Sequence, residues 1–352
     1  MAIAVFDRRT VGSLVSGDPY VQKARSICLD WLNRRETYTL PTSGSTGPPK
    51  QITVHSDQLK ASVYATSGAL SLYEGTRALA CLNIDYVAGF MMLVRAMELD
   101  WEVTLIAPSS NPLLLLPEKS GFDFTALVPM QLYEIVSNPE TSPRIKELGK
   151  ILLGGVGLTR SQLEAFKELE QEVYLGYGMT ETVSHVALQR IGETTPGRFH
   201  LTGDVDFGTD PRGCLYFRGA VTGDELVQTN DLATVFPEER SFLLHGRIDN
   251  VVNSGGIKIQ LEEMESQIGE LLAANQVFSD FFLWKIPDER LGNALVLVLE
   301  GTPESENRIS AILRKGIERL KRPRKIYFTK AFLKTGSNKT DKYRTFEMLT
   351  GP

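Results

Sequence analysis

Residues 42–50 read TSGSTGPPK, a run of hydroxyl side chains, glycines and prolines that ends in a lysine. Hydroxyls donate hydrogen bonds, glycines let backbone N–H groups come close to a ligand, and lysine adds a compact positive charge. This combination predicts a loop that holds phosphate, and the expected ligand is the triphosphate of a nucleotide. The predicted phosphate contacts are Thr42, Ser43, Gly44, Ser45, Thr46, Gly47 and Lys50.

The order of residues separates this loop from the Walker A loop, in which glycine and lysine are adjacent and a helix follows. Here Pro48 and Pro49 precede Lys50. Because prolines lack an N–H and push the preceding residue toward extended geometry, we expect a strand over residues 51–54. A P-loop NTPase is therefore disfavoured. Taken alone, the loop leaves a disordered Gly/Ser/Thr linker open as the alternative.

Length and composition indicate an ordinary globular protein. The chain has 352 residues, of which 42% are hydrophobic and 23% charged, so it is long enough for two domains. No apolar run approaches the ~20 residues that span a bilayer, and Asp7 interrupts the N-terminus before a signal sequence can form. Three isolated cysteines argue against a disulfide framework, and four scattered histidines argue against a zinc site. We expect a cytoplasmic protein with no membrane span and no protein-held structural metal.

The C-terminal end is basic although the whole chain carries a net charge of −5. Residues 314–344 contain twelve Lys or Arg against two acidic residues. Apolar positions such as Ile326 and Phe328 interrupt this segment, and it lacks an aromatic pattern that would stack on bases. We therefore expect a solvated basic face that can meet a polyanionic small molecule, and no nucleic-acid partner.

Alternating patterns predict an α/β fold for the first half of the chain. Five apolar strand-like runs are separated by segments with helical periodicity, as in a mostly parallel sheet covered on both faces. The expected strands lie at 78–84, 102–107, 124–129, 150–155 and 172–178, and the expected helices at 57–70, 89–99, 130–137 and 160–169.

Two further sequence patterns follow this α/β region. Residues 198–246 show short strands with tight turns, typical of a small antiparallel sheet or barrel. Past Arg247, helix-like and strand-like segments predict a compact α+β unit. We therefore expect a large N-terminal domain over residues 1–248, with a mostly parallel sheet and a small antiparallel β subdomain. A small α+β domain is expected over residues 249–352.

Later motifs add groups that suit a nucleotide. In YGMTE at 177–181, Tyr177 offers a flat face for a purine, Thr180 a hydroxyl for phosphate, and Glu181 an oxygen ligand for Mg²⁺. Asp231, in TNDLA, suits two ribose hydroxyls, and Arg247 can bridge ribose and phosphate. Each motif alone has an ordinary reading as a core tyrosine, a turn aspartate or a surface charge.

The functional interpretation depends on the order in which these motifs follow one another along the chain. The phosphate loop, YGMTE, TND, GRIDNVVNSGGIKI at 246–259 and a lysine loop around Lys339 follow one another as in the acyl-adenylate-forming superfamily of acyl-CoA synthetases, adenylation domains and luciferases. The chain resembles that superfamily from about residue 40 to its C-terminus. Within it, LLGGVGL, YGMTETVSHVAL and GRIDNVVNSGGIKI look most like the o-succinylbenzoate-CoA ligases of menaquinone biosynthesis.

The resemblance implies ATP, Mg²⁺ and CoA as cofactor and co-substrates. The loop at 42–50 would hold the β- and γ-phosphates, and Gly154, Gly155 and Tyr177 would frame the adenine. Thr180 would meet the α-phosphate, Glu181 the Mg²⁺ and Asp231 the ribose, while Arg247 closes the nucleotide site.

The resemblance also implies a moving C-terminal domain with Asp249 as its hinge. In one pose Lys339 would reach the carboxylate and the α-phosphate during adenylation. In the other pose the loop at 254–258 would line the site of thioester formation, through Ser254, Gly255, Gly256 and Lys258.

The acid pocket is expected around three residues. Tyr86 aligns with a gate position of the superfamily, and Ser184 is a candidate for the pocket wall. Arg95, alone among apolar neighbours on an expected helix, suits the second carboxylate of a succinylbenzoate because its planar fork pairs with a carboxylate bidentately. An arginine with a structural partner is the competing interpretation of Arg95.

The leading hypothesis is an AMP-forming acid–thiol ligase that makes o-succinylbenzoyl-CoA. A stand-alone adenylation protein that loads a carrier-protein thiol, and a nucleotide-binding sensor without chemistry, are the alternatives. The chain is shorter than typical members of the superfamily before residue 40. For that reason we expect a shortened front whose exposed flank a second copy covers in a homodimer.

Overall fold

The structure, a computed structural model, describes residues 3–41, 50–155, 157–193, 197–334 and 340–351. These residues form two compact units. The first comprises residues 1–208, 216–228 and 235–243, and the second comprises 209–215, 229–234 and 244–352. Each unit is described by itself below. The expected division between residues 248 and 249 stays a prediction.

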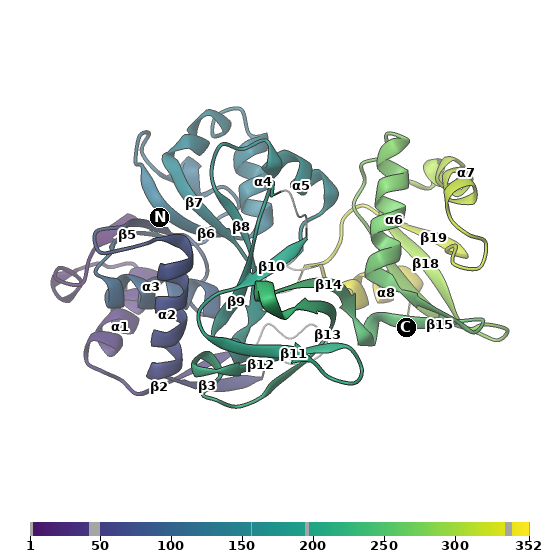
Figure 1. Cartoon of the computed structure of the whole chain (residues 1–352). Helices are drawn as coiled ribbons and strands as arrows, with labels where there is room; N and C mark the ends of the chain where they lie inside the picture. Colours follow the sequence, from purple (N-terminus) through teal and green to yellow (C-terminus); the bar gives the residue numbers. More distant parts are fainter. Residues whose placement is uncertain (1–2, 42–49, 156, 194–196, 335–339, 352) are drawn as a thin grey trace. The chain divides into compact units, whose positions relative to one another are not determined.

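One large sheet dominates the first unit (Figure 1). Its strand order is β1-β5-β4-β6-β7-β8-β9-β10-β14-β13-β12-β11. The five strands from β5 to β8 in this order are parallel, as the continuous apolar runs predict. They are β4 (Arg77–Ala80), β5 (Glu102–Ile106), β6 (Phe122–Leu127), β7 (Leu148–Leu153) and β8 (Val173–Met179).

Two hydrophobic cores cover this parallel region. Adjacent residues of β4 belong to different cores: Ala78 and Ala80 belong to one core, and Leu79 belongs to the other. Because successive side chains of a strand point to opposite faces, the two cores lie on opposite faces of the sheet. The first core includes residues of α1 (Pro19–Leu32), α2 (Ser56–Leu70) and α3 (Val87–Leu99), and the second includes residues of α4 (Pro129–Ser137) and α5 (Arg160–Lys167).

The antiparallel strands expected over 198–246 are present, and they continue the large sheet. β9 pairs antiparallel with β8, and β10 pairs antiparallel with β9, so the hydrogen-bond ladder carries on from the parallel region. β13 and β14 contribute residues to both compact units. These strands are β9 (Ser184–Arg190), β10 (Arg198–Leu201), β11 (Val205–Thr209), β12 (Cys214–Gly219), β13 (Val227–Phe236) and β14 (Ser241–Arg247).

A separate hairpin carries the predicted phosphate loop. β2 (Thr37–Pro41) and β3 (Gln51–His55) pair antiparallel, with Pro41 opposite Gln51 at the end of the ladder. The strand expected directly after Lys50 is therefore confirmed, and α2 begins only after β3. A strand in this place separates the loop from the Walker A arrangement, in which a helix follows the lysine.

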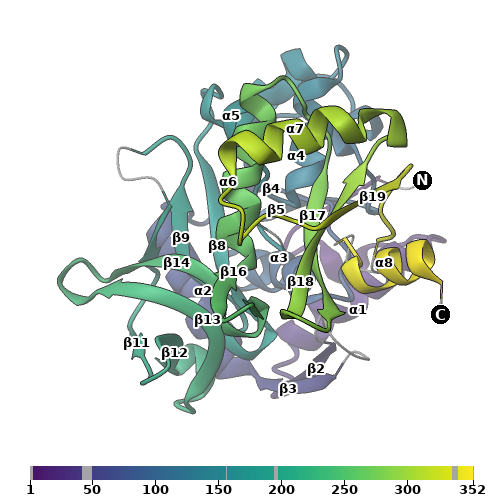
Figure 2. The same cartoon turned by 90° about the vertical axis from the view of Figure 1, so that its right-hand side faces the viewer.

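The second unit has its own sheet and core (Figure 2). β17 (Phe281–Asp288) pairs antiparallel with β18 (Gly292–Glu300), which pairs parallel with β19 (Lys325–Thr329). β15 (Val251–Ser254) and β16 (Ile257–Gln260) form a hairpin. The helices are α6 (Leu261–Ala274), α7 (Glu306–Gly316) and α8 (Lys342–Thr350), so the expected α+β unit is confirmed.

The edge strand of the large sheet next to the parallel region is β1 (Ile3–Phe6), antiparallel to β5. Ala4 and Phe6 enter the core, whereas Ile3 and Val5 are 44% and 55% exposed. The expected homodimer stays a prediction. In the part of the chain that the structure describes, no helix is both long and apolar enough to cross a membrane.

Candidate active site

Predicted site residues gather at the carboxyl ends of neighbouring parallel strands. Gly154 and Gly155 directly follow β7, and Thr180 and Glu181 directly follow β8, which is the next strand of the sheet. Tyr86 follows β4 at the start of α3. Because open α/β sheets bind ligands in the crevice outside the carboxyl ends of their strands, this edge is where a nucleotide site is expected. Gly155 has a φ of +95°, a conformation that favours glycine.

The turn after β8 is strained and tightly packed. Val183 and Ser184 have φ values of 56° and 114°, which are rare for side chains other than glycine. The Thr182 hydroxyl lies 2.8 Å from the carbonyl oxygen of Ser184 and 3.0 Å from the backbone N of Met179. A Cβ on Gly178 would lie 2.0 Å from that same carbonyl oxygen. Such strain persists only where the surroundings enforce it, and it concentrates at functional sites.

Within this turn, the two residues predicted to serve phosphate and metal differ in exposure. Thr180 is buried, whereas Glu181 is exposed and forms no ion pair with the described residues. In the described part of the chain there is also no group of three acidic, histidine or cysteine side chains that could hold a metal. A single exposed carboxylate fits Mg²⁺, which proteins usually bind through one or two carboxylates together with substrate phosphates.

Tyr177 lies in an aromatic cluster. Its ring centroid is 5.9 Å from that of Phe199, 5.8 Å from that of Phe217 and 5.2 Å from that of Phe242. These partners come from β10, β12 and β14. Edge-on and tilted contacts of this kind fix the orientation of an aromatic ring. The side chain is half-buried, so the packed ring retains exposed surface beside the carboxyl end of β8.

Arg95 is an arginine inside the core. It is 1% exposed in the middle of α3, whose residues are buried from Gly89 to Met97. Its Nη2 donates a hydrogen bond of 3.1 Å to Ser184 Oγ, and its Nε is buried with no hydrogen-bond partner in the described part of the chain. Burial lowers the pKa of Arg95 to about 10, so the guanidinium keeps its charge at neutral pH. The structure thus brings together two of the three predicted pocket residues.

Asp231 and Asp249 meet at the same arginine in the second unit. Arg247 Nη1 lies 3.3 Å from Asp231 Oδ1. Its Nε and Nη2 donate to the two oxygens of Asp249 at 2.9 and 2.7 Å. The hydrogen bond from Arg247 is the main cause that lowers the pKa of Asp249, and Asn230 adds to it. The predicted ribose acceptor and the predicted hinge residue are therefore joined by one charged side chain.

The predicted thioester-step loop is a tight turn between β15 and β16. Gly255 and Gly256 have φ values of 59° and 85°, which a two-residue hairpin turn of this kind requires. Gly255 N donates to Leu291 O at 2.9 Å, Ser254 is buried and Lys258 is exposed. The loop is therefore anchored at its first half and open at its second.

Some predicted residues lie outside the described ones. These are Thr42, Ser43, Gly44, Ser45, Thr46, Gly47 and Lys339. Lys50 is described and is exposed directly before β3. Their assigned roles stay predictions.

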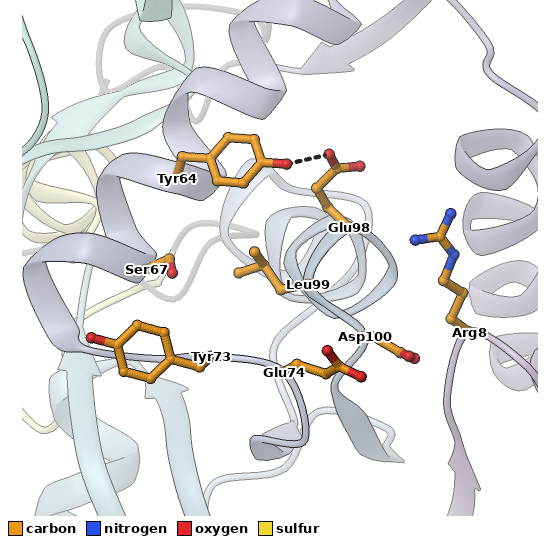
Figure 3. A pocket seen from close by; sticks show the side chains of 8 residues that line it. All are labelled: Arg8, Tyr64, Ser67, Tyr73, Glu74, Glu98, Leu99 and Asp100. Carbon is orange, nitrogen blue, oxygen red and sulfur yellow. Dashed lines mark hydrogen bonds between the residues drawn. The ribbon is translucent and has the colours of Figure 1, made fainter.

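A surface hollow of about 400 Å³ lies away from these residues, between α2, α3 and the segment after β1 (Figure 3). The Tyr64 hydroxyl donates to Glu98 across it at 2.9 Å, and Trp31 Nε1 also donates to Glu98, at 3.1 Å. Asp100 at its rim pairs with Arg9. Its lining contains none of the predicted site residues, and Glu98 and Asp100 already have partners, so we assign it no part in the site.

Sequence reasoning missed His185, which contacts Ser184 of the predicted pocket, and Thr66, which contacts His185. His185 Nδ1 lies 3.3 Å from Ser184 Oγ, and its Nε2 lies 3.2 Å from Thr66 Oγ1 on α2. Both residues are buried. Histidine and threonine on separate elements give no local signal, because the contact depends on how α2 packs on β9.

A mostly parallel sheet whose carboxyl edge gathers glycines, hydroxyls and a carboxylate is the arrangement of a nucleotide-binding α/β enzyme. The model of the AMP-binding enzyme family matches residues 31–207, which is half of the chain, and the chain belongs to this family. Its class is therefore that of the AMP-forming ligases, as the order of the sequence motifs indicates.

Similar proteins agree with this class. A solved acyl-CoA synthetase (AMP-forming)/AMP-acid ligase II-like protein from Dyadobacter fermentans is 43% identical, with a TM-score of 0.69, and the match covers 99% of this chain and 100% of that one. A probable 2-succinylbenzoate–CoA ligase from Mycobacterium tuberculosis is 25% identical over 333 residues, 88% of this chain and 84% of the relative. The o-succinylbenzoate coenzyme A synthetase of Bacillus subtilis, solved with ATP and magnesium ion, shares the fold at 19% identity and a TM-score of 0.71, over 88% of this chain and 69% of that one.

Proposed function

We propose that this chain activates 2-succinylbenzoate with ATP and transfers the acyl group to CoA, a step of menaquinone biosynthesis. The products are 2-succinylbenzoyl-CoA, AMP and pyrophosphate. Membership of the AMP-binding family supports the reaction class, and the similar 2-succinylbenzoate–CoA ligase supports this acid. One observation within the chain carries the choice of substrate, and it concerns Arg95.

A buried cation needs compensation, because removal of an ion from water costs several kcal/mol. Arg95 is 1% exposed, and Ser184 Oγ is its hydrogen-bond acceptor. No carboxylate of the described residues forms an ion pair with it. An acid with a second carboxylate would supply the missing charge, whereas a monocarboxylic acid would leave it uncompensated. A dicarboxylic substrate therefore fits this side chain better than a fatty or amino acid.

The two half-reactions assign work to this chain's own residues. In the first, the substrate carboxylate attacks the α-phosphorus and pyrophosphate leaves. Two anions must approach, so Lys50 and Lys339 are expected to offset their repulsion, and Thr180 to meet the α-phosphate. Glu181 would hold Mg²⁺, which when bound supplies positive charge at the phosphates. Asp231 and Arg247 would hold the ribose.

In the second half-reaction the CoA thiol attacks the acyl carbonyl, and AMP leaves as the C–O bond breaks. The acyl-adenylate already has a good leaving group, so this step needs no covalent intermediate on the enzyme. All three cysteines are buried, and burial raises the pKa of Cys28 and Cys81 to about 12, which makes them poor nucleophiles. Ser254, Gly255, Gly256 and Lys258 are expected to line this step.

The test is pyrophosphate release from Mg-ATP with 2-succinylbenzoate, with and without CoA, beside a panel of fatty, aromatic and amino acids. We expect turnover with 2-succinylbenzoate that depends on CoA. Turnover only with another acid would keep the chemistry and reject the substrate. Activation of an amino acid, with transfer to a carrier-protein thiol, would favour the adenylation protein. ATP binding without release for any acid would favour the sensor.

A variant of Arg95 tests the assignment of the substrate separately from the reaction class. Arg95→Met keeps the volume and removes the charge, so it is expected to raise the KM for 2-succinylbenzoate by about 100-fold, since a buried ion pair lost on one side costs a few kcal/mol. An aromatic acid without the second carboxylate serves as the control and should lose little. Equal losses with both acids would assign Arg95 a purely structural role.

A further inference from the structure

Four side chains from three elements form a continuous chain inside the first unit. Arg95 Nη2 lies 3.1 Å from Ser184 Oγ, which lies 3.3 Å from His185 Nδ1. His185 Nε2 lies 3.2 Å from Thr66 Oγ1, which donates to the carbonyl of Ser62 at 2.8 Å. Arg95, His185 and Thr66 are 1%, 7% and 0% exposed. The chain therefore runs from α2 through the first residues of β9 to the arginine on α3.

The donors along this chain can be assigned by counting hydrogens. Thr66 has one hydroxyl hydrogen, and the carbonyl of Ser62 takes it. His185 Nε2 must therefore carry the hydrogen that it shares with Thr66. Burial, with the nearby charge of Arg95 as a second cause, lowers the pKa of His185 to about 3, so the ring is neutral and has one N–H. Its Nδ1 is then an acceptor.

The same count of hydrogens assigns the donor and acceptor roles of Ser184. Ser184 donates its single hydrogen to His185 Nδ1, and its oxygen is left to accept from Arg95. Its position is fixed independently, because the strained backbone at Val183 and Ser184 is tied down by the hydroxyl of Thr182. Ser184 thus presents only an acceptor to the guanidinium, which retains further N–H groups, among them Nε, for which the described residues supply no hydrogen-bond acceptor.

We infer that His185 is a positioning residue for the acid substrate, which acts through Ser184 to fix the orientation of the Arg95 guanidinium. This inference rests on the proposed function, since it is the second carboxylate of the acid that Arg95 would bind. His185 does not touch the acid in this scheme. Its contribution is to make Ser184 an acceptor in a fixed place, so that one N–H of Arg95 is occupied and the others remain available to an anion.

Two variants separate positioning from structure in the pyrophosphate assay. His185→Phe removes both ring nitrogens and is expected to raise the KM for 2-succinylbenzoate by about tenfold while kcat and the KM for ATP stay within about twofold. His185→Gln is expected to restore most of the loss, because an amide can accept at Oε1 and donate at Nε2 at once. On a Ser184→Ala background, His185→Phe should add little. An unchanged KM in His185→Phe, or no rescue by glutamine, would overturn the inference.

A second measurement tests the assigned hydrogen-bond donors and acceptors without any substrate. ¹⁵N NMR of the histidine rings, with the His185 signals assigned by their loss in His185→Gln, should show a neutral Nε2–H tautomer at pH 7. Thr66→Val removes the acceptor and should shift the tautomer populations. An Nδ1–H or charged ring in the wild-type protein would overturn the scheme even if 2-succinylbenzoate is activated. A correct tautomer in a protein that activates no dicarboxylic acid would instead reject the proposed function.

Discussion

Arg247 donates two hydrogen bonds to the carboxylate of Asp249, from Nε at 2.9 Å and from Nη2 at 2.7 Å. Its third nitrogen, Nη1, lies 3.3 Å from Asp231 Oδ1. The fork geometry of the guanidinium suits such a bidentate contact. Asp231 and Asp249 are both carboxylates, so these two contacts hold the guanidinium from two sides. A ribose whose hydroxyls donate hydrogen bonds to Asp231 would meet a carboxylate whose orientation is already fixed.

Arg247→Lys keeps the charge and removes the fork. We expect the KM for ATP to rise by about tenfold, because a lysine can hold one carboxylate but not both in the same geometry. The measurement is pyrophosphate release against ATP concentration. Arg212→Lys is the control, since the pair of Arg212 with Asp210 in the same unit is about as exposed as that of Arg247 with Asp231, and Arg212 is assigned no role in the site. A similar loss in both variants would contradict the assignment of Arg247.

Gly178→Ala is expected to destabilise the protein by about 3 kcal/mol, because the new Cβ would lie 2.0 Å from the carbonyl oxygen of Ser184 and 2.6 Å from the Cα of His185. Urea unfolding measures the loss. The control is Gly68→Ala, at an exposed position of α2 with no atom near the new Cβ, where a gain of up to about 1 kcal/mol is expected. Equal stability of Gly178→Ala and the wild type would mean that the turn after β8 is not tightly constrained.

The pair Arg144–Glu147 should make stability depend on pH. The two side chains are 12% and 9% exposed, and the hydrogen bond from Arg144 lowers the pKa of Glu147 below its ordinary value of 4.5. Since the folded-state pKa is the lower one, the stabilisation is fully present above the unfolded-state pKa and is lost as pH falls through the folded-state pKa.

Glu147→Gln should therefore cost about 2 kcal/mol at pH 7, because it weakens charge-assisted hydrogen bonds in a nearly buried place. The difference from the wild type should shrink as pH falls below the ordinary glutamate value of 4.5 and through the lower folded-state pKa. Unfolding midpoints in urea, measured from pH 7 to pH 3, check both statements. A difference that stays constant over that range would show that the charge of Glu147 contributes nothing.

Lys339→Ala should separate the two half-reactions. We expect the rate of adenylate formation, measured as pyrophosphate release, to fall by about 100-fold or more. The reason is that a positive charge beside the two reacting anions is lost. Thioester formation from supplied acyl-adenylate and CoA should remain largely intact. Lys334→Ala, which removes another lysine of the same segment, is the control. Equal loss of both half-reactions would contradict the scheme in which the C-terminal domain takes two poses.

Local patterns were sufficient to predict much of the fold. The five parallel strands were predicted because each is a continuous apolar run, which a sheet covered on both faces requires. The strand after Lys50 followed from the two prolines before it. The antiparallel strands were also predicted, but not their union with the parallel region, because the pairing of β9 with β8 is a property of the ladder and not of either segment.

The candidate site was predictable in part. Arg95 and Ser184 were named one by one, from an isolated charge and from a motif, yet they lie 89 residues apart and their contact could not be inferred. His185 and Thr66 gave no signal, since their meeting depends on the packing of α2 against β9. Tyr177 was predicted to be a flat face, while its three phenylalanine neighbours come from strands that pair far along the sheet.

The antiparallel pairing of β2 and β3 fixes the two ends of the predicted phosphate loop at adjacent strand positions, Pro41 opposite Gln51. A segment whose two ends are held together can be shortened, lengthened or rewritten while both flanking strands keep their partners. Sequence changes can therefore accumulate in residues 42–50 without a matching change in the pairing of β2 and β3. In this respect the stretch that is predicted to hold phosphate is also an exchangeable segment, which makes it a natural place to graft loops from other ligases.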